Sequence, residues 1–454
     1  MELKGKRVLV VGAGKSGMAV SRFLARKGAR TVLTDTREAD KFGGQLDELA
    51  VAGVDLALGG YPPVKGNFDL LVMSPGVPLT IPPVQEAGEA GIPVTGELEL
   101  AYRFTRAPIV AITGTNGKTT TTTLVGKIFR DAGYRVLVAG NIGLPLVDRV
   151  ESYGPGDVIV AEVSSFQLET VHQFRPRVGV ILNLAPDHLD RHGDMAGYAA
   201  AKSRIAMNQR KGDFLVLNYD DGYTRGMAGR GGGDVIFFSR RHILEEGVFV
   251  HGNTITVCRG GVEKPVLDAG ELRIPGAHNL ENALAATAAC SAMGIAGEVM
   301  AKTLARFAGV AHRLEFVAEI DGVRYINDSK GTNPDASIKA VEAFPGPLVL
   351  IAGGKNKGND FTEFTRRAAG KTRAMVVLGQ CADEMAGAAA GAGIKNILRA
   401  ESFRDAVLLA RSAARPGDVV LLSPACASWD MFNNFEERGD LFKQIVREFE
   451  DISR

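Results

Sequence analysis

Short runs of aliphatic and β-branched residues alternate with longer helical patterns along nearly the whole chain of 454 residues. The first run, residues 7–14 (RVLVVGAG), is followed by a helical pattern over 18–28 that ends at a glycine and by a second run at 31–35. Strands that alternate with helices in this way favour an α/β fold with mainly parallel sheets. The chain is too long for one hydrophobic core, so we expect three domains.

Two positions along the chain are predicted domain boundaries. A new strand, residues 107–114 (APIVAITG), begins after the polar segment AYRFTR, which places the first boundary near residue 106. Later strands of this second domain are predicted at 135–140, 157–165 and 178–184, and an alanine-rich helix at 278–294 comes near its end. The glycine-rich segment 225–235 is predicted to be a mobile surface loop. A third domain is predicted from about residue 311.

Composition excludes several classes of protein. The formal net charge is +1, so the chain as a whole has no electrostatic attraction for nucleic acid or for an anionic membrane. The four cysteines are scattered without a CxxC pair, which fits a reducing cytoplasm better than a disulfide framework or a zinc site. The first residues do not form a signal peptide, and no apolar run has the length of a membrane helix. We therefore expect a cytoplasmic protein.

The first glycine-rich turn carries the pattern G-x-G-x-x-G, formed by Gly12, Gly14 and Gly17 directly after a predicted strand. Asp35 ends the next strand, about twenty residues later, as in the dinucleotide-binding fingerprint. The turn predicts either NAD or FAD, or simply some anion held at a helix N-terminus. The rest of the chain offers no recognisable site for hydride transfer.

A second glycine-rich turn, GTNGKT, follows the strand at 107–114. The usual P-loop has a glycine, four residues and then Gly-Lys-Ser/Thr, but here Gly114 stands two positions too late. Backbone N–H groups at the start of a helix, together with Lys118, suit a triphosphate. The Thr119 hydroxyl is placed to bind Mg²⁺. Threonine is a poor helix former, so five in a row at 119–123 suggest that hydroxyl groups are needed there.

Three further side chains are candidates for a metal site. Glu162 lies within or just beyond one predicted strand and His188 just past another that looks adjacent to it, and open α/β sheets bind ligands at the carboxyl ends of their strands. A carboxylate suits Mg²⁺, whereas imidazole is unusual for it, and the acidic residues near His188 can equally form a charged surface loop. Lys202 lies in a helical pattern, where a lysine is usually solvated.

The TGTNGKTTT form resembles the nucleotide loop of the Mur ligase and folylpolyglutamate synthetase superfamily. Further stretches look like the D-glutamate-adding branch of that family: SPGVP (74–78), AEVSSFQL (161–168), residues 185–205, NDSKGTNPDAS (327–337) and LLSPACASWDMFNNFEERG (421–439). The resemblance implies a Rossmann-like N-terminal domain that binds the UDP-substrate (1–106), a central P-loop-type ATP-binding domain (107–310) and a Rossmann-like C-terminal domain that binds the amino acid (311–454).

The same resemblance implies an ATP-dependent ligase of peptidoglycan precursor synthesis, acting as a monomer. It would join D-glutamate to the L-alanyl carboxylate of UDP-N-acetylmuramoyl-L-alanine through an acyl phosphate, and its first glycine turn would bind UDP instead of NAD. Three alternatives remain: another Mur-type or folylpolyglutamate-type amide ligase, a nucleotide-binding protein without catalysis, and an NAD-dependent sensor.

Residue by residue, the resemblance implies four groups of contacts. The UDP-substrate would contact Ser16, Asp35, Thr36, Arg37, Ser74, Gly76 and Asn141. ATP would contact Gly114, Thr115, Asn116, Gly117, Lys118, Thr119, Thr120, Asn282, Arg313 and Asp328. D-glutamate would contact Lys330, Thr332, Lys357, Ser428 and Phe435. Two Mg²⁺ ions would be held by Thr119, Glu162, His188 and Lys202, the last as a carbamate made from CO₂. Lys118, His188 and Lys202 are the catalytic candidates; His188 could act as a base only if it does not bind the metal.

Overall fold

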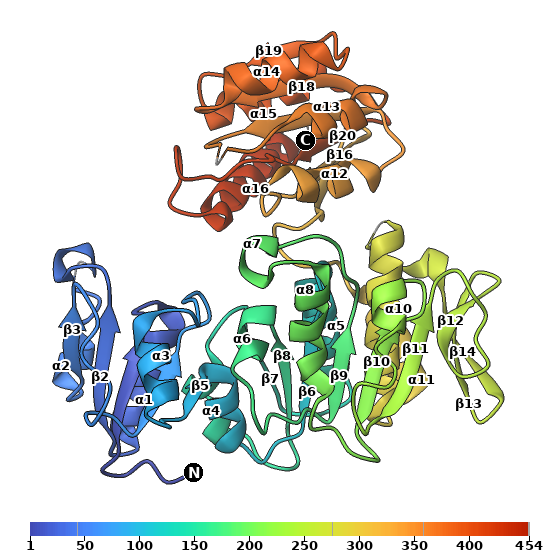
Figure 1. Cartoon of the computed structure of the whole chain (residues 1–454). Helices are drawn as coiled ribbons and strands as arrows, with labels where there is room; N and C mark the ends of the chain where they lie inside the picture. Colours follow the sequence, from blue (N-terminus) through green and yellow to red (C-terminus); the bar gives the residue numbers. More distant parts are fainter. Residues whose placement is uncertain (43, 275, 357, 453–454) are drawn as a thin grey trace. The chain divides into compact units, whose positions relative to one another are not determined.

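The computed structural model describes residues 1–42, 44–274, 276–356 and 358–452. The chain divides into two compact units (Figure 1). One is made of Met1–Glu271 and Glu281–Ala305, and the other of Leu272–Leu280 and Arg306–Arg454. Within the described ranges, no helix combines the length and apolarity needed to cross a lipid bilayer.

The first unit begins with a five-stranded parallel sheet in the order β3-β2-β1-β4-β5. Its strands are β1 (Arg7–Val11), β2 (Arg30–Asp35), β3 (Asp55–Leu58), β4 (Leu70–Met73) and β5 (Val94–Gly96). Its helices are α1 (Lys15–Arg26), α2 (Asp47–Val51), α3 (Pro82–Glu89) and α4 (Glu97–Arg103). Alternate residues of β1 enter different cores, because Val8 and Val10 pack with α1 whereas Leu9 and Val11 pack with residues near α3. The uninterrupted apolar run of β1 is therefore typical of a strand covered on both faces.

A nine-stranded sheet forms the rest of the first unit, in the order β14-β13-β12-β11-β10-β9-β6-β8-β7. The parallel strands are β6 (Ile109–Thr113), β7 (Val136–Gly140), β8 (Val158–Glu162), β9 (Val178–Ile181), β10 (Phe214–Asn218), β11 (Asp234–Ser239) and β12 (Gly247–His251). The sheet ends with the antiparallel strands β13 (Thr254–Arg259) and β14 (Val262–Asp268). The antiparallel extension was not predicted from the sequence.

Helices cover both faces of the nine-stranded sheet. They are α5 (Lys118–Asp131), α6 (Ser165–Glu169), α7 (Leu189–His192), α8 (Met195–Ser203), α9 (Gly222–Arg225), α10 (Ala277–Ala292) and α11 (Gly297–Arg306). The glycine-rich segment 225–235 is largely exposed, in agreement with the predicted surface loop, but part of its backbone packs closely. A Cβ atom at Gly232 would lie 2.8 Å from the backbone oxygen of Gln209, and the Gly232 N–H donates to that oxygen. Gly232 therefore serves close backbone packing.

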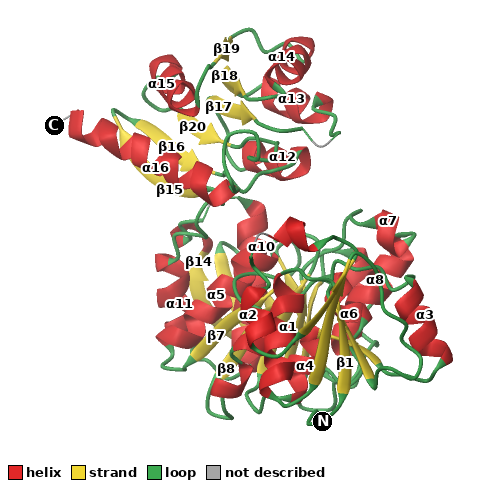
Figure 2. Ribbon diagram, turned by 90° about the vertical axis from the view of Figure 1, so that its left-hand side faces the viewer, coloured by secondary structure: helices red, strands yellow, loops and turns green. Residues whose placement is uncertain are grey.

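The second unit contains a six-stranded sheet in the order β15-β16-β20-β17-β18-β19, parallel except for β15. Its strands are β15 (Glu315–Ile320), β16 (Val323–Asn327), β17 (Leu348–Gly353), β18 (Thr372–Leu378), β19 (Ile397–Arg399) and β20 (Val419–Leu422). Its helices are α12 (Pro334–Glu342), α13 (Thr362–Ala369), α14 (Ala382–Gly391), α15 (Phe403–Ala413) and α16 (Phe435–Ile452). Figure 2 shows α12, α13 and α14 on one face and α15 and α16 on the other. Leu348 and Leu350 face the first group, and Val349 and Ile351 face the second.

One buried carboxylate joins the two sheets of the first unit. Glu99, in α4, accepts hydrogen bonds from the backbone N–H groups of His172, Gln173 and Phe174 at 2.9, 3.0 and 2.8 Å. Arg103, one turn later on the helix, adds an ion pair at 2.8 Å. Burial alone would raise the pKa of Glu99, but the hydrogen bonds from His172 and Arg103 outweigh it and hold the pKa below its usual value. The charge of Glu99 therefore stabilises this junction.

We predict that Glu99→Gln lowers the free energy of unfolding by about 2 kcal/mol at neutral pH, because an amide cannot accept all of these hydrogen bonds. The folded-state pKa lies below the unfolded one, so the stabilisation is present above the usual glutamate pKa and is lost as the pH falls through the folded value. When urea unfolding is measured at several pH values, the curves of the wild type and of Glu99→Gln should therefore converge in acid.

The matched control is Glu89→Gln on α3, where the side chain is exposed. This substitution should change the free energy of unfolding by less than about 0.5 kcal/mol. Equal unfolding midpoints for the two variants at neutral pH would contradict the role assigned to Glu99.

Candidate active site

Two glycines shape the loop between β6 and α5. Gly114 has a φ of +149° and Gly117 a φ of +82°, backbone conformations that other residues rarely adopt. A Cβ atom at Gly114 would lie 2.9 Å from the Leu182 Cβ, and one at Gly117 would overlap the Asn282 side-chain oxygen. Glycine therefore lets the loop pack against the end of β9 and against α10, which places the amino end of α5 where a phosphate binds well.

Asn183 holds this phosphate loop in place. Its Oδ1 accepts from the Asn116 N–H at 2.9 Å, and its Nδ2 donates to the Asn116 oxygen at 3.1 Å. Its backbone oxygen accepts from the Thr115 N–H at 3.0 Å, and the Thr115 hydroxyl accepts from the Ala185 N–H at 3.0 Å. Sequence reasoning missed Asn183, because its partners lie 67 positions earlier and only the fold brings them together.

Lys118 opens α5 and folds back over its own loop. Its Nζ donates to the backbone oxygens of Gly114 at 2.9 Å and Thr115 at 2.8 Å. The next two residues, Thr119 and Thr120, are buried in the first turn of the helix. The ammonium group and both hydroxyl-bearing side chains thus lie at the end of α5 where the helix dipole favours an anion.

Helix α10 brings a second polar group to the loop. The Thr121 hydroxyl donates to Asn282 Oδ1 at 3.3 Å, and that oxygen lies against Gly117. Asn282 and Asn279 are both buried near the start of α10. The structure therefore places Asn282, a predicted ATP contact, directly beside the phosphate loop.

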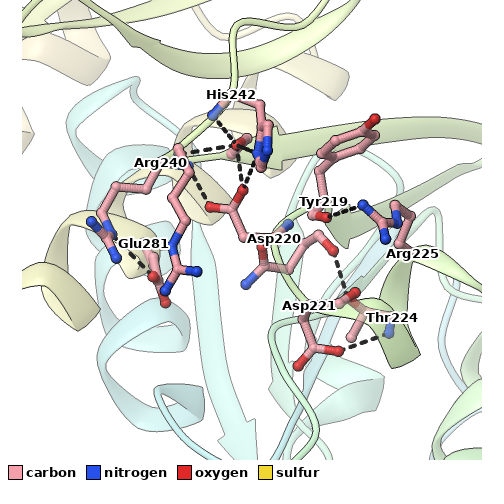
Figure 3. A network of polar contacts seen from close by, with 11 residues as sticks. Tyr219, Asp220, Asp221, Thr224, Arg225, Arg240, His242 and Glu281 are labelled. Atoms are coloured by element: carbon pink, nitrogen blue, oxygen red, sulfur yellow. Dashed lines mark hydrogen bonds and ion pairs between the residues drawn. The ribbon is translucent and has the colours of Figure 1, made fainter.

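A polar network fixes this end of α10, as Figure 3 shows. At the carboxyl ends of β10 and β11, Asp220 accepts from the Ser239 hydroxyl at 2.6 Å and from the Arg240 N–H at 2.8 Å. The Arg240 side chain donates to Glu281 at 3.1 Å. Glu281 directly precedes Asn282, so the network ties the position of Asn282 to the ends of two strands.

Lys202 is buried, with 1% of its surface exposed, which excludes a solvated helix position. Its Nζ donates to the Gly114 oxygen at 3.0 Å and to the Thr113 hydroxyl at 3.3 Å. The same nitrogen lies 4.6 Å from the centre of the Tyr198 ring. Burial, aided by the charge of Lys118, lowers the pKa of Lys202 to about 7. A neutral amine is therefore far more accessible here than at a surface lysine.

Glu162 ends β8 and His188 follows β9, and these two strands are not neighbours, which corrects the expectation from the sequence. Strand β6 lies between them in the sheet. The later strand β8 pairs with one edge of β6, and the later strand β9 pairs with the other edge. Ile112 of β6 pairs with Glu162, and Thr113 pairs with Ile181 of β9. The phosphate loop therefore follows the strand that lies between β8 and β9.

The environment of Glu162 fits a cation. The carboxylate is buried, and its Oε1 accepts from the Asn141 side chain at 2.9 Å. Its Oε2 has no hydrogen-bond partner among the described residues, which is costly for a buried oxygen and is relieved by a bound cation. His188 has a φ of +52°, its ring is half exposed, and its Nε2 lies 3.6 Å from the Asp187 carboxylate.

The part of the chain that the structure describes contains no group of three or more His, Cys, Asp or Glu arranged for a metal ion. A cation beside Glu162 would therefore take its other oxygen ligands from hydroxyl groups such as that of Thr119, from water and from a bound phosphate. Mg²⁺, which keeps several waters and substrate oxygens, suits such a sparse donor set.

Most of the predicted UDP-substrate residues line one cavity of about 430 Å³. The cavity lies between the first glycine turn, the loop after β4 and the loop after β7, and its volume suits a small-molecule ligand. The predicted residues that line it are Ser16, Asp35, Arg37, Ser74, Gly76 and Asn141. Thr36 is exposed and is not among the lining residues. Asn141 links this cavity to Glu162 through its side-chain hydrogen bond.

Asp35 and Arg37 bind each other in the wall of the cavity. The Arg37 guanidinium donates to both carboxylate oxygens of Asp35 at 2.9 Å, and the Ala13 N–H donates to one of them at 2.8 Å. The hydrogen bonds from Arg37 overcome burial and lower the pKa of Asp35 to about 2. Arg37 also lies over the Phe42 ring, at 4.5 Å from its centre. Asp35 thus orients the planar guanidinium.

In the second unit, Asp328 is a buried carboxylate at the end of β16. The Ser423 hydroxyl donates to it at 2.8 Å, and the Leu314 N–H donates at 3.3 Å. Burial raises the pKa of Asp328 to about 7, and the Ser423 hydrogen bond and the Arg313 charge offset this only in part. The two predicted ATP contacts of this unit, Arg313 and Asp328, are therefore close enough to interact electrostatically.

Four of the five predicted D-glutamate residues, Lys330, Thr332, Ser428 and Phe435, lie on segments that follow β16 and β20. The Lys330 ammonium lies 5.5 Å from the centre of the Phe435 ring, and Thr332 is half-buried close to Lys330 in the chain. Ser428 is buried, and its backbone oxygen accepts from two N–H groups of the following turn. Lys357 lies outside the described residues.

Arg438 was not singled out in the sequence, although it lies in the quoted stretch 421–439. It is buried, and it donates to the Ser329 hydroxyl and backbone oxygen, both at 2.9 Å, and to the Cys426 backbone oxygen at 3.3 Å. Burial lowers the pKa of Arg438 to about 10. This guanidinium connects the segment after β16 to the segment after β20, so it sets the spacing of the predicted amino-acid pocket.

Comparison of the sequence with protein families matches all three parts of the chain to one known family. The Mur ligase MurD-like N-terminal domain matches residues 6–96, the Mur ligase middle domain matches 112–290, and the Mur ligase glutamate ligase domain matches 312–426. A relative from Pelotomaculum thermopropionicum, named UDP-N-acetylmuramoylalanine–D-glutamate ligase, is 64% identical over 97% of this chain and 97% of its own length. The chain belongs to the Mur ligase family. A relative of the same name from Alkaliphilus metalliredigens is 48% identical over 98% of this Mur ligase and 99% of its own length.

Solved structures show that the fold of this Mur ligase is the family fold. The MurF ligase of Thermotoga maritima in complex with ADP matches with a TM-score of 0.61 and 16% identity, covering 99% of each chain. The UDP-N-acetylmuramate–alanine ligase MurC of the same organism gives a TM-score of 0.58 and 19% identity, covering 98% of this chain and 99% of that one. The predicted three-domain α/β architecture is therefore confirmed.

We predict that Asn183→Ala weakens ATP binding to this Mur ligase about tenfold, because two hydrogen bonds that order the phosphate loop are lost. Isothermal titration calorimetry with a non-hydrolysable ATP analogue measures this change. The control is Asn67→Ala, an exposed asparagine in the turn before β4, which should bind the analogue like the wild type. Equal dissociation constants for the two variants would refute the role of Asn183.

Proposed function

We propose that this Mur ligase joins D-glutamate to the L-alanyl carboxylate of UDP-N-acetylmuramoyl-L-alanine, with cleavage of ATP to ADP and phosphate. The observation that carries the proposal is the full-length similarity to relatives that bear the name of this activity, at 64% and 48% identity. The phosphate loop at the start of α5 agrees with ATP as the second substrate. The reaction belongs to the synthesis of the peptidoglycan precursor in the cytoplasm.

The proposed chemistry has two steps. A carboxylate oxygen of the L-alanyl group attacks the γ-phosphorus of ATP, ADP leaves, and an acyl phosphate forms. The amine of D-glutamate, after losing a proton, attacks the acyl carbon, and phosphate leaves from the tetrahedral intermediate. In the first step two anions must approach each other, so Lys118 and Arg313 are proposed to offset the developing negative charge.

In this proposal the 430 Å³ cavity holds the UDP-substrate. Arg37, oriented by Asp35, presents a planar cation to a phosphate or a ring face. Asn141 contacts the muramoyl-linked part and, through its hydrogen bond to Glu162, connects that substrate to the phosphate loop. The predicted domain boundaries near 106 and 310 remain part of the proposal, with one chain as the active unit.

We assign D-glutamate to the segments that follow β16 and β20. A dicarboxylate needs cations and hydrogen-bond donors, and Lys330, Lys357, Thr332 and Ser428 supply them in the sequence. Phe435, whose ring lies near the Lys330 ammonium, bounds the pocket. Arg438 holds the two segments at a constant spacing.

Mg²⁺ would be held by Glu162, Thr119 and His188, where the Glu162 Oε2 needs a partner. When bound, the ion supplies positive charge that stabilises the transferring phosphoryl group. The chain itself binds the phosphates: Lys118 orients them, and the glycine loop brings the amino end of α5 against them.

We further propose that Lys202 reacts with CO₂ to form a carbamate. The neutral amine adds to the carbon of CO₂ and releases a proton, so an ammonium position becomes an anionic oxygen ligand. The buried, charge-repelled position of Lys202 favours the neutral amine that this reaction needs. The resulting anion would lie beside the Gly114 oxygen, on the same side of the loop as Lys118.

Phosphate release measured with a panel of amino acids tests the proposed function. We expect turnover only when ATP, UDP-N-acetylmuramoyl-L-alanine and D-glutamate are all present. Turnover with L-alanine, a diamino acid, a dipeptide or a folate substrate instead would identify another amide ligase of the superfamily. NAD binding without any amino-acid-dependent phosphate release would favour a sensor.

We predict that Lys202→Arg abolishes turnover almost as completely as Lys202→Ala, because a guanidinium keeps the positive charge but cannot take up CO₂. The measurement is the steady-state rate of phosphate release with all three substrates. The matched control is Lys302→Arg, on the exposed side of α11, which should retain the wild-type rate. Wild-type turnover in Lys202→Arg would remove the carbamate from the mechanism.

A further inference from the structure

Two of the four cysteines meet in the second unit. Cys381 directly precedes α14 and Cys426 follows β20, 45 positions later, yet their Sγ atoms lie 3.1 Å apart. Both side chains are buried. Sulfur atoms in a disulfide are about 2.05 Å apart, so a bond requires an approach of only roughly 1 Å.

The backbone holds the two thiols together through one glycine segment. The Cys381 N–H donates to the Gly354 oxygen at 3.0 Å, and Lys355 and Ala427 exchange backbone hydrogen bonds at 2.9 and 3.2 Å. Gly354 has a φ of +134°, and a Cβ atom there would lie 3.2 Å from the Cys426 Cβ. The segment thus fixes the backbone on both sides of the sulfur contact and leaves room for it.

The other two cysteines offer an internal comparison. Cys258 donates through its Sγ to the Glu245 backbone oxygen at 3.0 Å, and Cys290 is buried within α10. Both belong to the first unit, so neither is part of the Cys381–Cys426 contact. The pair is therefore distinguished by its geometry from the remaining thiols of the same chain.

Cys381 is the more reactive of the two thiols. The hydrogen bond between the two thiols lowers the pKa of Cys381, while the same contact and burial raise the pKa of Cys426. Cys381 also occupies the N-cap position of α14, without a capping hydrogen bond from its side chain, and the helix dipole there favours a thiolate. The preceding residues Gly379 and Gln380 are exposed, so the pair lies just beneath the surface.

We propose that Cys381 and Cys426 form a redox-modification site, at which a peroxide joins them in a reversible disulfide. The Cys381 thiolate attacks one oxygen of hydrogen peroxide, the O–O bond breaks, and the leaving hydroxide takes up a proton to give water and a sulfenic acid. The Cys426 sulfur then attacks the Cys381 sulfur and loses its proton, the S–O bond breaks, and the departing hydroxide takes up that proton to give the second water. Two thiols and one peroxide give one disulfide and two waters, and a dithiol reductant reverses the change.

The disulfide would alter the pocket assigned to D-glutamate, a consequence that rests on the proposed function. The Cys426 backbone oxygen accepts from Arg438 at 3.3 Å, and Ser428 follows two residues later. Pulling Cys426 toward Cys381 shifts both the Arg438 contact and the Ser428 hydroxyl. Oxidation should therefore raise the KM for D-glutamate several-fold and leave the KM for ATP nearly unchanged.

Mass spectrometry of the full-length protein decides whether the bond forms. The reduced protein is treated with hydrogen peroxide, unfolded in the presence of N-ethylmaleimide and digested without reductant. We expect a peptide pair linked through Cys381 and Cys426, with Cys258 and Cys290 alkylated, and loss of the link after dithiothreitol. Alkylation of all four cysteines after peroxide would overturn the proposal, whether or not the protein is an active ligase.

Cysteine variants test whether the Cys381–Cys426 disulfide changes the KM for D-glutamate. Cys381→Ser should keep the reduced-state rate and the same KM for D-glutamate before and after peroxide, and Cys381→Ala replaces it if the serine variant fails to fold. The matched control, Cys258→Ser, should respond to peroxide like the wild type. A peroxide-induced rise of KM in the Cys381 variant equal to that of the wild type would refute the link to the pocket. A reduced wild type without D-glutamate-dependent phosphate release would instead refute the proposed function and leave the mass measurement valid.

Discussion

One backbone oxygen, that of Gly114, gathers two lysine side chains at the centre of the first unit. Lys118 donates to it at 2.9 Å and Lys202 at 3.0 Å, from helices that are far apart in the sequence. Two ammonium groups that share one acceptor repel each other, and the buried one is the easier to neutralise. The proposed carbamate would replace this repulsion by an attraction, because Lys118 would then face an anion. The left-handed backbone of the glycine loop makes this arrangement possible.

In each of the two units, polar side chains hold together the segments that form a candidate pocket, but the chemical groups differ. In the first, the ends of parallel strands surround the phosphate loop, and Asn183 and Asn282 hold it through their side-chain amides. In the second, the segments after β16 and β20 are joined by the buried guanidinium of Arg438. Each candidate pocket therefore depends on polar side chains that hold neighbouring segments together, and such groups are costly to remove once buried.

The fold was largely predictable from local patterns, because strands buried on both faces appear as continuous apolar runs. The predictions at 7–14, 107–114 and 178–184 are confirmed by β1, β6 and β9. Strand order was not predictable, and the assumed adjacency of Glu162 and His188 was wrong, since β6 separates their strands. The burial of Lys202 was invisible too, because α8 carries small residues on most faces and shows no clear apolar stripe. The roles assigned to individual site residues stay predictions, and the Cys381–Cys426 contact joins segments that no sequence spacing connects.

The antiparallel strands at the end of the nine-stranded sheet carry no candidate catalytic group, yet they decide how that sheet stops. The outermost strand, β14, contains Pro265, which has no N–H to offer, and exposes the charged side chains of Glu263 and Lys264. A strand from another chain that paired with β14 would lack one hydrogen-bond donor and would have to desolvate two charges. This edge therefore disfavours the addition of a strand from another chain.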